Sequence, residues 1–177
     1  MSKPVTIWRI ATDTPDYVAE DKTGAGANAT GGRWNRAGTP MLYCSGSIAL
    51  ACLETLVHLK VGALPLNRYL VGIEVPEAVW KAAKSLDPAA HVGWDALPHG
   101  MVSLDAGEKW SASTASLLYV VPSVIVPHEH NVLINPLHAD IAKLTFRKLS
   151  KWTYDTRLMP SPPAKKAPVR NALRRQT

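Results

Sequence analysis

Apolar and polar residues alternate in several short segments of the chain, and this period of two predicts strands. Three such segments, rich in β-branched and aromatic residues, are VTIWRI at 5–10, PMLYCS at 40–45 and RYLVGIEVP at 68–76. LLYVVPSVIVP at 117–127 predicts two strand-like pieces, interrupted at Pro122 and Ser123, because proline cannot donate to a strand ladder. A further short strand is predicted in VLINP at 132–136.

Other segments repeat their apolar residues at helical spacing. Such a helix is predicted from Ile48 to about Lys60, with Ser45 or Ser47 as its N-cap. Shorter helices are expected at 77–83 and around 103–113, and an amphipathic terminal helix at 138–149. Strands and helices are thus mixed without regular βαβ alternation, which favours an α+β domain built on curved or split antiparallel sheets.

A long polar segment separates the first two predicted strands. Residues 12–36 consist largely of Gly, Asn, Thr and Asp, and a loop of this length in a compact domain is typically functional or disordered. Neither a GxGxxG nor a GxxxxGK[ST] nucleotide fingerprint occurs in the chain.

The positive charge of the chain is concentrated at its C-terminal end. Of a net charge of +6, five charges come from Lys165, Lys166, Arg170, Arg174 and Arg175, in a Pro-rich stretch without acidic residues. We therefore predict a single nearly neutral domain at 1–159 and a flexible basic tail at 160–177 that serves at most as a weak docking arm. A neutral body gives no reason to expect direct nucleic-acid binding.

The sequence also predicts a soluble protein of the cytoplasm. No apolar signal core opens the chain, and the longest apolar run is broken by prolines far short of the roughly 18 residues of a spanning helix. The two cysteines, Cys44 and Cys52, form no CxxC pair and are interpreted as core residues in a reducing compartment.

Three conventional catalytic sites find little support. His128, Glu129, His130 and His138 lie close in sequence, but no HExxH or matching cysteine accompanies them, and no metal is expected. Ser123 lacks the GxSxG elbow of a hydrolase, and neither it nor Cys44 has an evident neighbouring base.

A stronger candidate combines Arg9, Arg33, Tyr43, Glu54 and Ser123. Each alone has an ordinary structural interpretation, such as a loop-closing arginine or a helix-surface glutamate. Together they provide the groups needed to bind a dinucleotide with a cationic glycosidic centre. Guanidinium groups bind pyrophosphate, an aromatic ring stacks on a flat base, and a carboxylate stabilises an oxocarbenium-like charge.

Three segments in order also resemble one family. GGRWN, LYCSGSIALACLETLVHL and VVPSVIVPHEHNVLINPLH are similar to the RES-domain toxins of RES-Xre toxin-antitoxin pairs, over about residues 8–149. The Arg, Glu and Ser that name the family fall on Arg33, Glu54 and Ser123. Its aromatic partner falls on Tyr43 and its first-strand arginine on Arg9. Asn135, Pro136 and His138 match its closing segment as wall residues, Asn135 being a candidate cofactor-binding residue.

The resemblance implies an ADP-ribosyltransferase-like fold, with split or curved mixed sheets, flanking helices and NAD as the substrate in a cleft between two small sheets. It implies a toxin that cleaves the nicotinamide-ribose bond of NAD with water or phosphate as acceptor. The alternative is an ADP-ribosyltransferase that modifies a specific protein, and a non-catalytic NAD-binding or regulatory module is a further one. An Xre-like helix-turn-helix antitoxin would cover the cleft. The sequence leaves the acceptor and the oligomeric state open.

Overall fold

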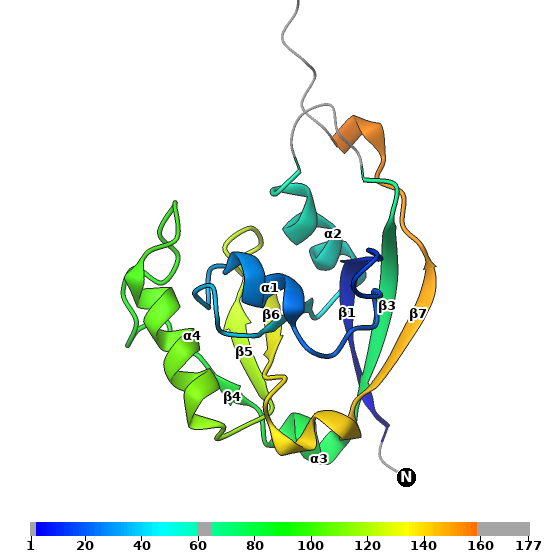
Figure 1. Ribbon diagram of the computed structural model, residues 1–177. Coiled ribbons are helices and arrows are strands. Elements are labelled where there is room, and N and C mark those ends of the chain that lie inside the picture. The colour runs from blue at the N-terminus through cyan, green and yellow to red at the C-terminus, as the bar shows by residue number, and fades with distance from the viewer. Residues whose placement is uncertain (1–2, 60–64, 159–177) are drawn as a thin grey trace, which may run out of the picture.

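The computed structural model describes residues 3–59 and 65–158, which form a mixed sheet of seven strands with helices around it. The strand order is β4-β5-β6-β2-β1-β3-β7, and only the β4–β5 pair is parallel (Figure 1). The strands are β1 (Val5–Thr12), β2 (Leu42–Ser45), β3 (Arg68–Val75), β4 (Lys84–Ser85), β5 (Leu118–Pro122), β6 (His130–Ile134) and β7 (Thr145–Lys151). The expected α+β class with a mixed, unclosed sheet is confirmed, while the predicted tail at 160–177 lies outside the described residues.

The sheet is almost divided between β1 and β2. These neighbours share a single register pair, Trp8 with Ser45, whereas β1 pairs with β3 along all eight residues. In Figure 1 the strands β1, β3 and β7 lie to the right of helix α1 (Ala25–Thr30), whereas β5 and β6 lie below it in the view. One edge of β1 from Arg9 to Thr12 is therefore left without a strand partner.

One apolar core spans both halves of the sheet, and a second cluster packs on the β1–β3 half. Ile7, Val71 and Ile73 are fully buried in the main core together with Leu42 and Ile134, which joins the two halves. On the other face of β1, helix α2 (Ile48–Leu56) packs through Ala51 against Ile10 and Leu70. The face-to-face burial explains why the two halves stay together although only one residue pair links β1 to β2.

Helix α2 begins where the sequence indicates. The hydroxyl of Ser47 accepts a hydrogen bond from the amide of Leu50 at 3.1 Å, so Ser47, rather than Ser45, is the N-cap. The helix ends at Leu56, earlier than the predicted Lys60, and residues 57 and 58 form a turn. Lys60 itself lies outside the described residues. The helices α3 (Glu77–Lys81) and α4 (Met101–Ser113) are close to their predicted ranges.

Two predicted elements are wrong. Residues 138–149 form a 3-10 turn, η1 (Ala139–Lys143), followed by strand β7, instead of one amphipathic helix. The half-buried Phe146 follows the buried Leu144 with a period of two, and β7 pairs with the edge of β3. Tertiary pairing thus overrides the helical spacing. The second strand-like piece, residues 124–127, is a series of bends and a turn, and α1 was not predicted within the 12–36 loop.

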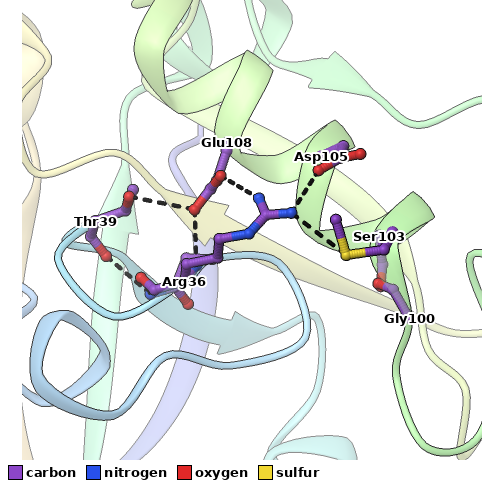
Figure 2. A network of polar contacts seen from close by, with 8 residues as sticks. Arg36, Thr39, Gly100, Ser103, Asp105 and Glu108 are labelled. Carbon is purple, nitrogen blue, oxygen red and sulfur yellow. Dashed lines mark hydrogen bonds and ion pairs between the residues drawn. The ribbon is translucent and has the colours of Figure 1, made fainter.

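An ion-pair network fixes the loop after α1 to α4 (Figure 2). The guanidinium of Arg36 donates to Asp105 at 2.7 Å and also to Glu108, which in addition accepts from the Arg36 backbone amide at 2.9 Å. Nearby, Gly107 packs directly on the backbone of Trp34, where a Cβ atom would lie 2.0 Å from the Trp34 carbonyl oxygen. Helix and loop can approach this closely only because residue 107 is glycine.

A short 3-10 turn, η2 (Thr156–Leu158), closes the described part of the chain. Within residues 3–59 and 65–158, the helices are all too short or too polar to span a bilayer.

Candidate active site

A cavity of about 420 Å³ opens where the two halves of the sheet diverge. Its walls come from the unpaired edge of β1, from β2, and from residues of α1 and α2, and Arg68 at the start of β3 also lines it. The size is within the range of small-molecule sites. The single β1–β2 register pair thus has a direct consequence, because the strand edge that a longer pairing would occupy is available to a ligand.

The carboxylate of Glu54 lines this cavity and is held by two neutral donors. Its Oε1 accepts hydrogen bonds from the Ser123 hydroxyl at 2.8 Å and from the Asn131 amide at 2.5 Å. Asn131 is itself oriented by Ser45, whose hydroxyl donates to its side-chain oxygen at 2.7 Å. Among the described residues no donor is bonded to Oε2 of Glu54, so this oxygen remains available to a ligand.

Ser123 is 1% exposed and all of its hydrogen-bonding capacity is engaged. Its hydroxyl donates to Glu54 and accepts from the amides of Ile125 and Val126 at 3.1 and 3.0 Å. The break after Pro122 therefore does turn the serine inwards, towards the Glu54 carboxylate. The hydroxyl is thus buried behind the Glu54 carboxylate and does not line the cavity, so it is not placed to attack a ligand there.

Tyr43 lies on β2 and contributes its ring to the cavity wall. Its hydroxyl donates to the Asn35 side chain at 2.6 Å and accepts from the Trp34 amide at 3.1 Å. Burial raises the pKa of the Tyr43 phenol far above its usual value, so the group remains protonated at neutral pH. Gly32 permits this arrangement, since a Cβ atom there would lie 2.6 Å from the Tyr43 hydroxyl.

Arg33 lies in the loop beside the cavity and is partly buried. Its Nη1 donates to the carbonyls of Trp94 and Ala96 at 3.1 and 3.0 Å, which attaches the 94–96 segment to this loop. Desolvation lowers the pKa of Arg33, while the charges of Glu54 and Asp95 raise it. Arg33 and Glu54 are therefore close enough to interact electrostatically, although the structure shows no direct ion pair between them among the described residues.

Arg9 reaches the cavity from β1. Its one hydrogen bond within the described residues is a long one of 3.5 Å to the Asp21 carbonyl. Burial is the main cause of a lowered pKa for Arg9, offset in part by Cys44 and Asp21. A partly buried guanidinium with little compensation is placed to bind an anionic ligand.

The closing segment, which contains Asn135, Pro136 and His138, lies outside the cavity lining. Asn135 is fully buried, its amide donating to the Ser111 carbonyl at 2.8 Å and its side-chain oxygen accepting from the Leu137 amide at 3.0 Å. His138 caps the turn η1 through its Nδ1, and Pro136 packs beside Gly24. The structure does not bring these three residues to the cavity lining, and it gives each a local packing or bonding role instead.

Sequence reasoning missed Asn131, Ser45 and Arg68. Asn131 and Ser45 are cross-strand partners in the β2–β6 register, which the sequence alone does not reveal. Arg68 is the first residue of the alternating strand β3 and resembles any charged residue at the start of a strand. Across residues 3–59 and 65–158, no three His, Cys, Asp or Glu side chains are grouped as a metal site would require.

The chemistry of the site is that of an anion-binding cleft with one fixed carboxylate. Arginine side chains can hold phosphate groups, the Tyr43 ring can contact a flat base, and Glu54 can accept from sugar hydroxyls or stabilise a developing positive charge.

Known proteins resemble this chain along most of its length. The RES domain family matches residues 6–157. A protein from Sphingobium sp. (strain YBL2), called Prs ADP-ribosylating toxin, is 54% identical over 155 residues, which cover 87% of this chain and 96% of that protein. Two proteins called Toxin Res are also similar. The one from Pseudomonas putida is 35% identical, and the match covers 86% of this chain and 98% of that protein. The one from Yersinia enterocolitica is 37% identical, and the match covers 69% of this chain and 79% of that protein.

Proposed function

This chain belongs to the RES domain family, and we propose that it is a toxin that consumes NAD by cleaving the bond between nicotinamide and ribose. The names of its relatives support a toxin whose substrate supplies ADP-ribose. The observation that carries the proposal is the Glu54 carboxylate, fixed through Oε1 by Ser123 and Asn131 and open to the cavity through Oε2.

Glu54 would act on the charge that develops during cleavage. As the C1–N bond breaks, its electron pair leaves with nicotinamide, which becomes neutral, and positive charge grows on the ribose. An immobile carboxylate near C1 stabilises this charge more in the transition state than in the ground state, and that difference accelerates the reaction. An acceptor then forms a bond to C1 and loses a proton.

The other residues would hold the substrate and the carboxylate. Because both functions of the Tyr43 hydroxyl are used within the protein, we assign its ring to stacking on nicotinamide or ribose. Arg9 and Arg33 would bind phosphate oxygens, Arg33 by exchanging its carbonyl partners for the substrate. Ser123 would act through Glu54, since its hydroxyl is already saturated. Asn135 is left out of the proposed site.

Transfer of ADP-ribose to a protein is the second candidate. The word "ADP-ribosylating" in the name of the 54% identical relative favours it. Both reactions share the leaving group and the developing cation, so the same residues serve either. A non-catalytic module is disfavoured, because the chain retains the arginine, tyrosine, glutamate and serine together.

The partner is inferred from the family resemblance, and the location from the sequence. We propose that an Xre-like helix-turn-helix antitoxin covers the cavity and that the toxin acts in the cytoplasm, where NAD is available. No metal is assigned to the reaction.

Expression of the chain without its partner tests the proposal. Growth should stop as cellular NAD falls, or as ADP-ribosylated protein accumulates. Glu54→Gln at the same expression level is the matched control, because it removes one charge and retains the shape. Growth arrest at constant NAD, with no ADP-ribosylated protein, would exclude the enzymatic function.

A second experiment identifies the acceptor. The purified chain is incubated with NAD, with and without inorganic phosphate, and the products are identified by mass. Free ADP-ribose indicates water, a phosphorylated ADP-ribose indicates phosphate, and NAD loss that requires an added protein, with a matching gain in that protein's mass, indicates transfer.

A further inference from the structure

Arg68 is a cavity residue that the proposed roles leave unused. It is the first residue of β3, where its carbonyl accepts from the Trp152 amide at 2.8 Å and thereby fixes the backbone. Its side chain lines the cavity, yet its Nε is buried and has no hydrogen-bond partner among the described residues. Buried guanidinium nitrogens are rarely left without an acceptor, so a missing one points to a ligand.

Arg68 and Arg9 approach the cavity from opposite faces of the sheet. Thr12 is the register partner of Arg68, and cross-strand partners share a face. Arg9 is three positions from Thr12 on the same strand and therefore points to the other face. Both residues nevertheless line the same cavity, because it lies along the unpaired edge of β1. The two guanidinium groups thus flank this strand edge.

The charges of the two arginines are not neutralised within the cavity. Burial is the main cause of the lowered pKa of Arg9, Asp21 outside the cavity lining offsets it in part, and repulsion from Arg68 lowers it further. Of the described residues that line the cavity, Glu54 is the only acidic one, and it is bonded to Ser123 and Asn131 rather than to either arginine. Two partly buried like charges destabilise the free protein, and an anion placed between them removes that cost.

We propose that Arg68 and Arg9 form a subsite for a diphosphate, in which the two guanidinium groups bind the two phosphates from either side of the β1 edge. The assignment rests on the proposed function in identifying the ligand as the ADP-ribose part of NAD. Planar guanidinium groups suit this role because each can bind phosphate oxygens through two parallel N–H donors. Arg33, which interacts electrostatically with Glu54, supplies a further cation for the phosphates beside this subsite.

Arg68→Gln in the full chain tests the subsite by calorimetric binding of ADP-ribose, inorganic pyrophosphate and adenosine. We expect the affinities for ADP-ribose and pyrophosphate to fall about ten- to a hundredfold, with adenosine binding unchanged. Arg68→Lys should retain part of the affinity. Arg147→Gln is the matched control, because Arg147 pairs with Glu74 at 3.2 Å outside the cavity and its loss changes the net charge equally.

Thermal unfolding provides a readout that separates ligand binding from a structural role. Since Arg68 adds an unpaired charge to the free protein, free Arg68→Gln should unfold at the same temperature as wild type or higher, and ADP-ribose should raise that temperature less. A lower unfolding temperature or loss of folding in Arg68→Gln, or unchanged pyrophosphate and ADP-ribose affinities, would overturn the subsite. If wild type bound both diphosphates through Arg68 but left NAD intact, the subsite would stand and the proposed reaction would fail.

Discussion

Glu108 and Glu54 are both partly buried glutamates on helices, but the structure neutralises only one of them. Glu108 and Asp105 of α4 bind Arg36, and their hydrogen bonds raise the pKa of this arginine above its usual value (Figure 2). Glu54 receives only neutral donors on one oxygen. Arg9 in the cavity and Arg33 in the loop beside it have lowered pKa values, mainly because of burial.

The difference separates structural charge from functional charge. The charges of the Arg36 network are paired with one another, and these interactions hold the loop against α4. At the cavity, the arginines and the Glu54 carboxylate are held by neutral side chains and backbone carbonyls. Their unused hydrogen-bonding groups are available to a ligand in a space of about 420 Å³. Such preorganised but unsatisfied charges are typical of sites that bind a charged ligand or transition state.

Glu54→Gln is expected to produce the largest effect. The substitution preserves the shape and much of the hydrogen bonding but removes the charge. A loss of about 3 kcal/mol of transition-state stabilisation lowers NAD turnover by roughly two orders of magnitude. NAD binding and the unfolding temperature should stay near wild type. A folded variant that turns NAD over like wild type would exclude Glu54 from catalysis.

Arg33→Ala should weaken NAD binding about ten- to a hundredfold, since a charge-assisted hydrogen bond contributes roughly 1.5 to 3 kcal/mol. Lysine should restore only part of it, because it lacks the planar fork. Isothermal titration with NAD measures the change. An affinity equal to wild type in Arg33→Ala would show that this arginine only attaches the 94–96 segment.

Glu108→Gln makes the same substitution in the neutralised region and should have the opposite outcome. Losing the charged partner of Arg36 should lower the free energy of unfolding only slightly, because the pair is partly exposed and solvent screens it. The turnover of NAD by the folded protein should not change. Denaturant unfolding and NAD turnover on one preparation check both, and a large loss of turnover at wild-type stability would contradict the division into two regions.

Removal of the tail should have the smallest effect. A chain that ends at Met159 lacks the five basic residues of the tail and should turn over NAD at the wild-type rate, because that composition cannot build a packed core. Loss of turnover in a truncated chain that remains folded would show that the tail contributes to the site.

Local patterns were sufficient to predict most elements that have a clear period or cap. The remaining elements depend on strand pairing between distant residues. Alternation identified β1 and β3, and the capping serines, Ser45 or Ser47, predicted the start of α2, for which the structure selects Ser47. The Thr145–Lys151 strand was mistaken for helix because its pairing with β3 involves residues about 75 positions away, which local spacing cannot express.

The same limit applies to the site. Motif segments indicated Arg33, Tyr43, Glu54 and Ser123, and the structure places the Glu54–Ser123 bond between residues 69 positions apart. Asn131 and Arg68 could not be predicted, because their relevance depends on the β2–β6 register and on the unpaired edge of β1.

Nicotinamide release from NAD by the purified full chain tests the central claim most directly. Nicotinamide and remaining NAD are quantified together in a reaction that contains water, phosphate and a candidate protein acceptor. The account predicts one nicotinamide for each NAD lost with wild type, and roughly a hundredfold slower release with Glu54→Gln at unchanged NAD binding. Wild-type protein that binds NAD in the cavity but releases no nicotinamide in any of these conditions would contradict it.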